Sequence, residues 1–322
     1  MPHITFIHGI SNKPPKEKLL TIWQDGLAGN KLSNNDAIDL GTEGVTCSMV
    51  YWADVLYEKP LEAGSAEEEG LSGIRDFESA EAAAGGESAD PDMSWREEIS
   101  GEEKKLVDSL AGKLSFDVLV EDTFTPPKTA MDKTLERVPL PWFIKRRIMK
   151  QFLRDVHHYL FNFKFSPRTG VSFDVQNEIR QRTIKELQEG ATKPGPHIVV
   201  CHSMGTIIAY DCLLRVKDCP TIDGIMTIGS PLGIDEIQDK LKPEYSRQKG
   251  FVPNIKSSWV NVYDTLDPVT GFDGNIGNDF LKDGEEVIDV INESNWGIWR
   301  HNITKYLSGP KLRAALAKQL DL

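Results

Sequence analysis

The chain has 322 residues, of which 39% are hydrophobic and 27% are charged, and its formal net charge is −12. This composition is ordinary for a folded protein, and the length is enough for one large domain with insertions or for two domains. The acidic balance argues against a nucleic-acid-binding protein, because neutralising phosphates requires a surplus of lysine and arginine. We therefore expect no nucleic-acid partner.

The sequence also lacks the patterns of metal proteins, exported proteins and membrane proteins. None of the four cysteines shows C-x-x-C spacing and there is no H-E-x-x-H motif, so we expect neither a metal nor another cofactor. The first strand pattern starts at residue 3 with no secretory leader before it, and no apolar run reaches the length of a membrane span. A cytoplasmic setting is the expectation, although export by a signal-independent route would leave no trace in the sequence.

The first elements follow a strand–helix–strand pattern. Residues 3–9 (HITFIHG) are a short β-branched and aromatic run that ends in glycine, which predicts a buried strand. Residues 16–30 place apolar side chains at helical spacing, and residues 45–57 predict the next strand. At these lengths the three elements predict a right-handed βαβ unit.

A long insertion follows, at about residues 58–170. Residues 62–103 are rich in Glu, Ala, Gly and Ser with few apolar side chains, so we expect a mobile, solvated acidic loop. Helical patterns resume over residues 104–170, and residues 140–165 predict a basic amphipathic helix that carries several aromatic side chains. Two interpretations of this helix are open. It packs its aromatic side chains on the core, or it docks on anionic lipid as a peripheral membrane contact.

The α/β alternation restarts near residue 171. Residues 172–190 predict a helix with Ser172 as its N-cap and Gly190 at its end. The other predicted elements are strands at 197–203, within 221–231, within 257–269 and at 285–292, and helices at 205–217 and, with a break at Gly309-Pro310, at 302–320. The predicted fold class is α/β, with a mostly parallel sheet of about six strands flanked by helices. Residues 1–57 and 171–322 are the expected catalytic domain, and residues 58–170 are the inserted cap.

The stretch PHIVVCHSMGT (196–206) contains the candidate nucleophile. Ser203 lies directly between a predicted strand and a predicted helix, where a nucleophile elbow needs small neighbours in a strained turn. Gly205 meets that need, whereas Cys201 stands where the G-x-S-x-G pattern has its first glycine. The alternative interpretation is a serine that caps the following helix.

A serine nucleophile needs a histidine base, a carboxylate behind the base, and N–H donors for the oxyanion. Of the seven histidines only His301 lies downstream of the last predicted strand, where the order Ser…Asp…His can close. The other six lie in strands, in the basic helix or beside predicted turns: His3, His8, His157, His158, His197 and His202. We therefore predict His301 as the base.

The acid should follow a strand that lies between the serine and the histidine. In WVNVYDTLDPV (259–269), Asp264 ends the strand and Asp267 lies in the turn fixed by Pro268. We prefer Asp267, with Asp264 as the alternative, although Asp267 also fits a turn-forming Asp-Pro. Asp289, within a strand pattern, is a more distant candidate.

The oxyanion donors should come from the residue after the nucleophile and from the turn after the first strand. This rule predicts the N–H of Met204 together with that of Ile10 or Ser11, with Gly9 permitting a tight approach. The presence of a serine elbow elsewhere in the chain favours this hypothesis over an ordinary strand-ending turn.

Five segments together resemble the α/β-hydrolase superfamily, most of all its lipase and esterase branches: FIHGI, VVCHSMGT, IGSPLG, YDTLDPV and RHNITKYL. The resemblance covers residues 3–57 and 171–320, and it implies a mostly parallel sheet and hydrolysis of an ester through an acyl-enzyme. It implies these roles: nucleophile Ser203, acid Asp267, base His301, and oxyanion donors Ile10 and Met204. The segment GSPLG (229–233) is similar to one that borders the acyl pocket in lipases, which favours a lipid-like substrate. The chain departs from the family at Cys201, and it begins at the strand usually placed third, which suggests a minimal sheet.

Three functions fit these residues. The first is a serine ester hydrolase whose partner is a lipid or small acyl ester substrate. The second is a thioesterase, amidase or peptidase that uses the same triad, which a panel of substrates would separate from the first. The third is a catalytically inactive α/β-hydrolase-fold protein that binds a ligand, for which a Ser203→Ala variant would behave like the parent.

Overall fold

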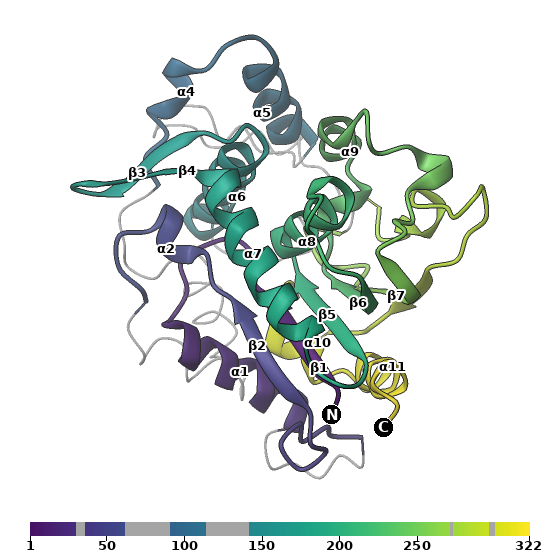
Figure 1. Ribbon diagram of the computed structural model, residues 1–322. Helices are drawn as coiled ribbons and strands as arrows, with labels where there is room; N and C mark the ends of the chain where they lie inside the picture. The colour runs from purple at the N-terminus through teal and green to yellow at the C-terminus, as the bar shows by residue number, and fades with distance from the viewer. Residues whose placement is uncertain (30–35, 62–90, 114–141, 271–272, 296–299) are drawn as a thin grey trace.

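The structure is a computed structural model that describes the chain apart from residues 30–35, 62–90, 114–141, 271–272 and 296–299 (Figure 1). Residues 62–90 of the predicted acidic loop therefore lie outside the described part. So do residues 114–141 of the predicted insertion.

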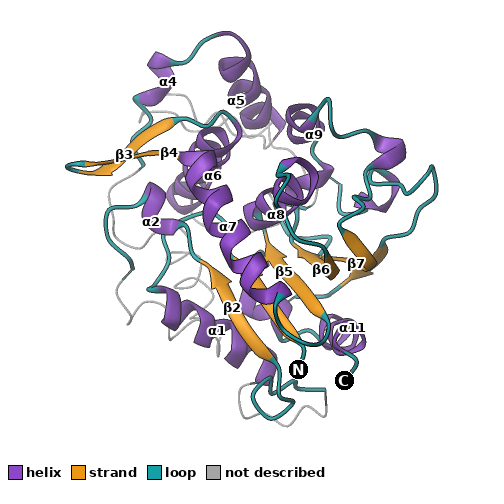
Figure 2. Ribbon diagram, in the orientation of Figure 1, coloured by secondary structure: helices purple, strands orange, loops and turns teal. Residues whose placement is uncertain are grey.

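Six parallel strands form the central sheet (Figure 2). They are β1 (His3–Ile7), β2 (Thr46–Val50), β5 (His197–His202), β6 (Ile222–Ile228), β7 (Ile255–Tyr263) and β8 (Asp289–Asn292). Their spatial order is β2-β1-β5-β6-β7-β8, and every neighbouring pair is parallel. The predicted α/β class with about six strands is confirmed, and this sheet is parallel throughout. Parallel sheets are covered on both faces, which explains why β5 is buried at every position.

Helices cover both faces of the sheet (Figure 1). One apolar core joins the strands to α6 (Trp142–Leu160), α7 (Val175–Ala191) and α8 (Met204–Arg215). A second core joins them to α1 (Lys16–Ala28), α10 (Ile303–Leu307) and α11 (Pro310–Leu320). Within β1, Ile7 belongs to the first core while Ile4 and Phe6 belong to the second. The strand thus contributes apolar side chains to both layers.

The second strand is shorter than predicted. β2 ends at Val50, and residues 53–56 of the predicted strand form the short helix α2 (Ala53–Leu56). The chain turns at Trp52, whose backbone and indole N–H groups both donate to His8, at 3.1 Å each. This contact joins residues that are far apart in the sequence, so the apolar pattern could not reveal it.

The basic helix also ends earlier than predicted. α6 stops at Leu160, and Asn162 has a positive φ of 49° that leads the chain out of the helix. Residues that were predicted as helix form β3 (Lys164–Arg168), which pairs antiparallel with β4 (Val171–Asp174). These two strands form a separate two-stranded sheet.

The next helix is shifted relative to its prediction. Ser172 lies in β4 rather than at an N-cap, and Asp174 takes the N-cap position of α7 without a side-chain cap hydrogen bond. Gly190 lies inside the last turn of α7 and does not end it. A Cβ on Gly190 would lie 2.4 Å from the His197 ring. Close packing against the sheet therefore requires this glycine.

The predicted acidic loop at 62–103 is too long. Its described part contains α4 (Trp95–Glu98) and the start of α5 (Gly101–Lys113). Trp95 is 6% exposed and stacks on His157 of α6, with 4.4 Å between the ring centroids. The buried Trp95 side chain packs this otherwise polar segment against α6. The average composition of residues 62–103 does not reveal such a contact.

α6 is buried on all sides rather than amphipathic over residues 148–160. Even Lys150 and Arg154 are only 8% and 7% exposed, and Arg154 pairs with Asp155 at 2.8 Å. The helix therefore packs into the core. Its contact with anionic lipid stays a prediction, to which these buried basic side chains add no support.

The remaining elements lie in the second half of the chain. They are α9 (Asp235–Leu241) and the short 3-10 helices η2 (Pro231–Gly233), η3 (Arg247–Lys249) and η4 (Ile276–Asn278). The predicted strand at 285–292 is shortened to Asp289–Asn292. The predicted break at Gly309-Pro310 is confirmed, because it separates α10 from α11.

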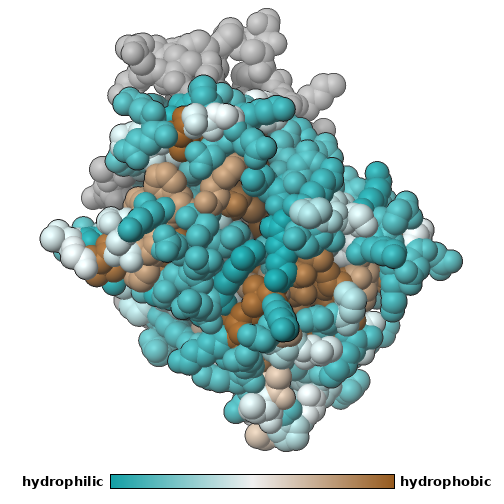
Figure 3. All heavy atoms as spheres, turned by 45° about the horizontal axis from the view of Figure 1, so that its top comes forward, coloured by the Kyte–Doolittle hydropathy of each residue, from teal (hydrophilic) through white to brown (hydrophobic). Residues whose placement is uncertain are grey.

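Hydrophilic side chains predominate on the face shown in Figure 3, and apolar ones gather in patches between them. Among the described large apolar residues, only Met1, Val287 and Leu322 are exposed. No helix in the described part is both long and apolar enough to cross a bilayer. The four cysteines are free, and three of them are buried.

Candidate active site

The strand order reverses between β1 and β5. From β1 the chain proceeds to β2 on one side, and from β5 it proceeds through β6 and β7 to β8 on the other. At such a switch point the loops after two neighbouring strands diverge and leave a crevice at the carboxyl ends of the strands. Every predicted site residue except Asp289 follows the carboxyl end of a strand at this edge.

Ser203 forms the sharp turn between β5 and α8. Its backbone has φ 54° and ψ −129°, a conformation that costs a non-glycine residue on the order of 1–3 kcal/mol. The Ser203 N–H donates to the Ile228 carbonyl at 2.9 Å and holds the turn. The hydroxyl is buried, makes no cap hydrogen bond to α8, and has no hydrogen-bond partner among the described residues. Ser203 thus occupies the N-cap position of α8, but its side chain does not cap the helix.

Close packing surrounds this turn. A Cβ on Gly205 would lie 2.4 Å from the Ile7 carbonyl oxygen, and one on Gly9 would lie 2.6 Å from the Cβ of Ser203. Glycine is thus required where α8 and the loop after β1 approach each other. Cys201 is fully buried, and its thiol donates to a carbonyl of β6 at 3.4 Å. This side chain fits into the core and leaves the turn sharp.

The predicted acid and base are paired. Nδ1 of His301 lies 2.8 and 3.0 Å from the two carboxylate oxygens of Asp267. This carboxylate is fully buried, and it also accepts from the Tyr306 hydroxyl at 2.7 Å and from the Val269 N–H at 2.8 Å. Because a carboxylate only accepts, Nδ1 of His301 carries the hydrogen. The other ring nitrogen, Nε2, is left as the basic one.

The His301 ring lies beside the residue that precedes Ser203. Its centroid is 4.6 Å from that of His202, with 35° between the rings. On another side it meets Gly229, which has φ 54° and where a Cβ would lie 3.1 Å from the ring. No hydrogen bond joins the Ser203 hydroxyl to the imidazole in this state. Such bonds are often long in substrate-free enzymes and shorten when substrate binds.

His202 is a poor candidate for the base. Burial, followed by the nearby charges of His301 and Lys13, lowers the pKa of His202 well below its ordinary value. The ring therefore stays neutral at physiological pH and packs against His301 as an uncharged surface.

The alternative acids have other surroundings. Asp264 accepts from two backbone N–H groups at 2.7 Å each, one of them that of Asn295, and from the Arg300 guanidinium at 3.2 Å. These bonds hold the segment that leads to His301 rather than the imidazole itself. Asp289 is exposed at the start of β8, at the opposite edge of the sheet.

The loop at residues 8–11, called the β1 loop below, is held by a neutral histidine. Nδ1 of His8 lies 2.8 Å from the Gly9 carbonyl oxygen, and the Trp52 N–H donates to Nε2 at 3.1 Å. Burial, then the nearby charge of Lys13, lowers the pKa of His8 to about 3, so the single ring hydrogen sits on Nδ1 and is donated to Gly9. In a trans peptide the N–H points away from the C=O, so the next N–H, that of Ile10, points away from the His8 ring.

Of the two candidate donors in the β1 loop, Ile10 is the one whose N–H is available. The Ser11 N–H donates to the Asp155 carboxylate at 3.0 Å. The Ile10 N–H has no hydrogen-bond partner among the described residues, nor has the Met204 N–H, which is the first of its helix. These two groups are the donors that could bind an oxyanion.

The sequence patterns did not reveal the parts played by Tyr306 and His8. Tyr306 follows His301 by five residues, and its hydroxyl accepts from the Asp264 N–H at 2.9 Å while it donates to Asp267. The sequence contained one hint of this role: Tyr306 lies on the buried face of the predicted helix that follows the candidate base. For His8 the hint was the His-Gly pair at the end of the first strand, but its partner Trp52 could not be foreseen.

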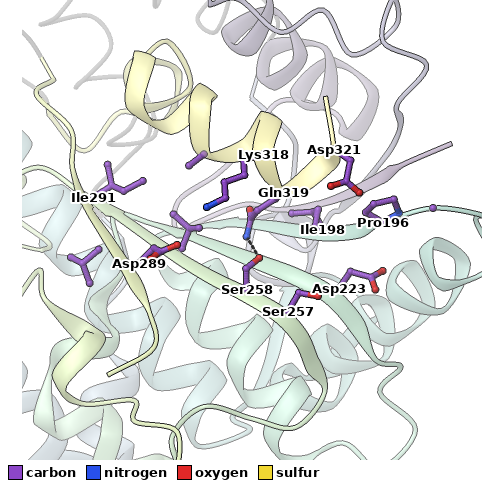
Figure 4. Close-up of a pocket in the computed structure, with 14 residues that line it drawn as sticks. Pro196, Ile198, Asp223, Ser257, Ser258, Asp289, Ile291, Lys318, Gln319 and Asp321 are labelled. Atoms are coloured by element: carbon purple, nitrogen blue, oxygen red, sulfur yellow. Dashed lines mark hydrogen bonds between the residues drawn. The ribbon is translucent and has the colours of Figure 1, made fainter. Parts of the chain in front are cut away.

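A pocket of about 670 Å³ lies at the other edge of the sheet, near the amino-terminal ends of the strands (Figure 4). Its lining includes Ile198, Asp223, Ser258, Asp289, Lys318 and Gln319. The Gln319 side chain donates to the Ser258 hydroxyl at 2.8 Å. Ser203, Asp267 and His301 do not line this pocket, so the candidate active site is elsewhere.

The chemical groups of the candidate site are a buried serine in a strained turn, a histidine–carboxylate pair and two backbone N–H donors. Among the described residues, no cluster of three or more His, Cys, Asp or Glu side chains could hold a metal ion. No protein-family model and no curated protein sequence matches the chain.

Proposed function

We propose that this protein is a serine hydrolase that cleaves carboxylic esters through Ser203, His301 and Asp267. The observation that supports this most is the strained Ser203 backbone, with φ 54°, at the same sheet edge as the 2.8 Å bond between His301 and Asp267. Backbone strain of this kind persists only where the surrounding structure enforces it, and it clusters at functional sites. We also propose an α/β-hydrolase fold for the sheet, with residues 58–170 as an inserted cap.

In the proposed first step, Oγ of Ser203 attacks the ester carbonyl carbon while its proton passes to Nε2 of His301. The carbonyl electron pair moves to oxygen, and the N–H groups of Ile10 and Met204 stabilise the oxyanion. Asp267 stays ionised and stabilises the imidazolium. Collapse of the oxyanion breaks the ester bond, and the leaving alcohol takes the proton from His301.

In the second step a water molecule attacks the acyl-enzyme. The water gives one proton to His301, and the tetrahedral intermediate again places its charge at the two N–H donors. When this intermediate collapses, the Ser203 oxygen leaves and takes the proton back. The products are a carboxylic acid and the free enzyme.

The proposed substrate has a lipid-like or small acyl group. The support is the resemblance of GSPLG (229–233) to the segment that borders the acyl pocket in lipases. Gly229 of this segment leaves room for His301, since a Cβ there would lie 3.1 Å from the ring. A cytoplasmic location stays a prediction from the sequence.

A fluorophosphonate probe tests the proposal, because it labels serines that are activated as nucleophiles. The folded parent should be labelled at Ser203, as identified by peptide mass spectrometry, and Ser203→Ala should abolish both labelling and hydrolysis. Asp267→Asn should lower kcat by about 10⁴-fold, and Asp264→Asn, its matched control, by much less. A panel of esters of rising chain length, with a phospholipid, a thioester and an amide, identifies the bond that is cleaved. A folded parent that resists the probe would count decisively against the proposal.

A further inference from the structure

We propose that Asp155 of α6 is a positioning residue for the oxyanion donor Ile10, an inference that rests on the proposed function. Asp155 is fully buried and lies in the predicted insertion, 144 positions along the chain from Ser11, to which it is hydrogen-bonded. It touches neither Ser203 nor His301 in any hydrogen bond among the described residues. Its effect on the reaction would be exerted through the β1 loop.

Two side chains of α6 hold Ser11 in an unusual backbone conformation. Ser11 has φ 73°, in the left-handed region that non-glycine residues seldom adopt. Its N–H donates to Asp155 at 3.0 Å, and its hydroxyl donates to Gln151 at 2.7 Å. Gln151 and Asp155 are four residues apart and lie on one face of the helix. These two bonds offset the strain of the left-handed residue.

The orientation of the Ile10–Ser11 peptide follows from these contacts. Its N–H points to Asp155, and its carbonyl accepts from the Lys13 ammonium at 2.7 Å. The preceding peptide is oriented by His8, which donates to the Gly9 carbonyl at 2.8 Å. The Ile10 N–H lies in the peptide plane that His8 orients, and this plane joins the Ile10–Ser11 plane at the Cα of Ile10. A shift of the Ile10–Ser11 peptide therefore displaces the Cα from which the Ile10 N–H is placed.

The Asp155 carboxylate is itself held firmly. The Arg154 guanidinium donates to one oxygen through Nε at 3.0 Å and Nη2 at 2.8 Å. The other oxygen accepts from the Tyr57 hydroxyl at 2.9 Å as well as from Ser11, and Arg154 lies 4.5 Å from the centre of the Tyr57 ring. A buried carboxylate with two guanidinium donors on one oxygen and two further donors on the other has little freedom to turn elsewhere.

The loss of the Asp155 contact should therefore affect the chemical step rather than substrate binding. Without its acceptor the Ser11 peptide can relax out of the left-handed conformation, which rotates the neighbouring Ile10 N–H. An oxyanion donor acts on the tetrahedral intermediate more than on the bound ester, so its displacement lowers kcat while leaving KM almost unchanged.

The test compares Asp155→Asn with Tyr57→Phe in the full-length protein. Asp155→Asn removes the anion that holds Ser11, so we expect kcat to fall about 10- to 100-fold, with KM within about twofold. Affinity for a trifluoromethyl ketone analogue of the ester, which forms the oxyanion, should fall by about the same factor. Tyr57→Phe removes a different donor from the same oxygen and leaves the Ser11 contact. It should lower Tm but keep kcat within about twofold of the parent.

Ser11→Ala keeps the proposal testable if Asp155→Asn does not fold. It removes the bond to Gln151 without disturbing the buried ion pair, and kcat should fall about threefold to tenfold. An unchanged kcat in a folded Asp155→Asn, or in Ser11→Ala, overturns the inference. The inference is also overturned if Asp155→Asn and Tyr57→Phe lose kcat equally and in proportion to their loss of Tm, because this result indicates a purely structural role. A parent that neither reacts with the probe nor hydrolyses any ester overturns the proposed function itself, whereas an active parent with active variants overturns this inference alone.

Discussion

The Asp267 carboxylate receives three kinds of donor: a ring N–H, a hydroxyl and a backbone N–H. The imidazole of His301, the hydroxyl of Tyr306 and the backbone N–H of Val269 lie within 2.7–3.0 Å of its two oxygens. Tyr306 also accepts from the Asp264 N–H at 2.9 Å, so one hydroxyl connects the turn that carries the acid to the helix that follows the base. Tyr306 thus fixes the carboxylate in the orientation that aligns His301.

Replacing Tyr306 by phenylalanine should weaken both stability and catalysis. The change leaves the buried Asp264 N–H without its acceptor, which costs about 1–3 kcal/mol of unfolding free energy. The Asp267 carboxylate keeps its other donors but gains freedom to turn, so kcat should fall about threefold to tenfold with little change in KM. Urea unfolding and ester hydrolysis measure the two effects.

Tyr210→Phe is the matched control for this prediction. The Tyr210 hydroxyl is equally buried and donates to the Gly250 carbonyl at 2.7 Å, but its surroundings contain no candidate catalytic residue. This variant should lose comparable stability and keep its kcat. A Tyr306→Phe enzyme with the kcat of the parent would show that the hydroxyl is dispensable for alignment.

At this scale the sequence was informative where a residue type and its local context determine the chemistry. Ser203 could be chosen because small residues surround it between a strand and a helix, and His301 because it alone follows the last strand. The preference for Asp267 over Asp264 came from its place in the turn before Pro268, and the 2.8 Å contact with His301 agrees with it. Asp155 could not be foreseen, because its contact with Ser11 depends on how a helix 144 positions away packs in three dimensions.

The start of α8 packs directly on the end of β1. A Cβ on Gly205 would lie 2.4 Å from the Ile7 carbonyl oxygen and 2.7 Å from that of His8. Both atoms belong to the backbone, so neither can move away without shifting the strand. The position of α8 therefore depends on the absence of a Cβ at Gly205.

Gly205→Ala should lower the free energy of unfolding by about 1–3 kcal/mol, because overpacking at a backbone contact forces the helix away from the sheet. The same shift moves Met204 and should lower kcat in parallel. Gly112→Ala in α5 is the control, since nothing lies within 4 Å of a Cβ there. It should raise stability by about 0.5–1 kcal/mol, as expected for alanine in a helix. Denaturation midpoints that fall for both variants, or for neither, would contradict this account.

The elements that sequence patterns predicted well are those buried at nearly every position, such as β1, β5 and α8. The predicted boundaries were wrong where tertiary contacts determine the end of a strand or helix. β2 gives way to α2 at Trp52 because two hydrogen bonds to His8 turn the chain there. α6 ends before β3 because Phe165 pairs with Phe173 of β4. Apolar residues at helical spacing in the sequence do not exclude such a strand pairing.

All seven histidines of the chain are buried. Burial lowers the pKa of His157 to about 4, with nearby Lys240 as a second cause, and that of His158 to about 2, with His157 and Arg154 as further causes. Burial, followed by the neighbouring His3, also lowers the pKa of His197 to about 4. The folded protein thus holds several imidazoles in the neutral form at a pH where the unfolded chain would protonate them.

His157, His158 and His197 together predict acid sensitivity. Their folded pKa values lie below the unfolded value of about 6.5, so the stability is fully present above pH 6.5 and is lost as the pH falls below it. Each such histidine contributes a slope of about 1.4 kcal/mol per pH unit between pH 6 and 5. Urea unfolding at pH 8, 6 and 5 measures the slope. His158→Phe removes one of these titrating rings, so it should reduce the slope by about 1.4 kcal/mol per pH unit. A phenylalanine fits at this position because Phe163 and Phe165 already surround the His158 ring. A stability that is constant from pH 7 to 5 would contradict the prediction.

At the scale of the whole molecule, the α/β alternation predicted the layers and the site at their edge, because parallel strands bring all their carboxyl ends together. The strand order could not be deduced, since nothing in the chain specifies that β5 adds next to β1 rather than next to β2. That choice creates the switch point where the β1 loop and Ser203 meet.

The two ends of the chain lie near each other at the amino-terminal edge of the sheet (Figure 1). The N-terminal ammonium donates to the Pro194 carbonyl, and Asp321 lines the same pocket as Gly195 and Pro196. Any attachment made through either end, whether a bead, a dye or additional polypeptide, would therefore project from the side remote from Ser203. Tethered copies could be packed densely on a support without covering one another's sheet edge that carries Ser203.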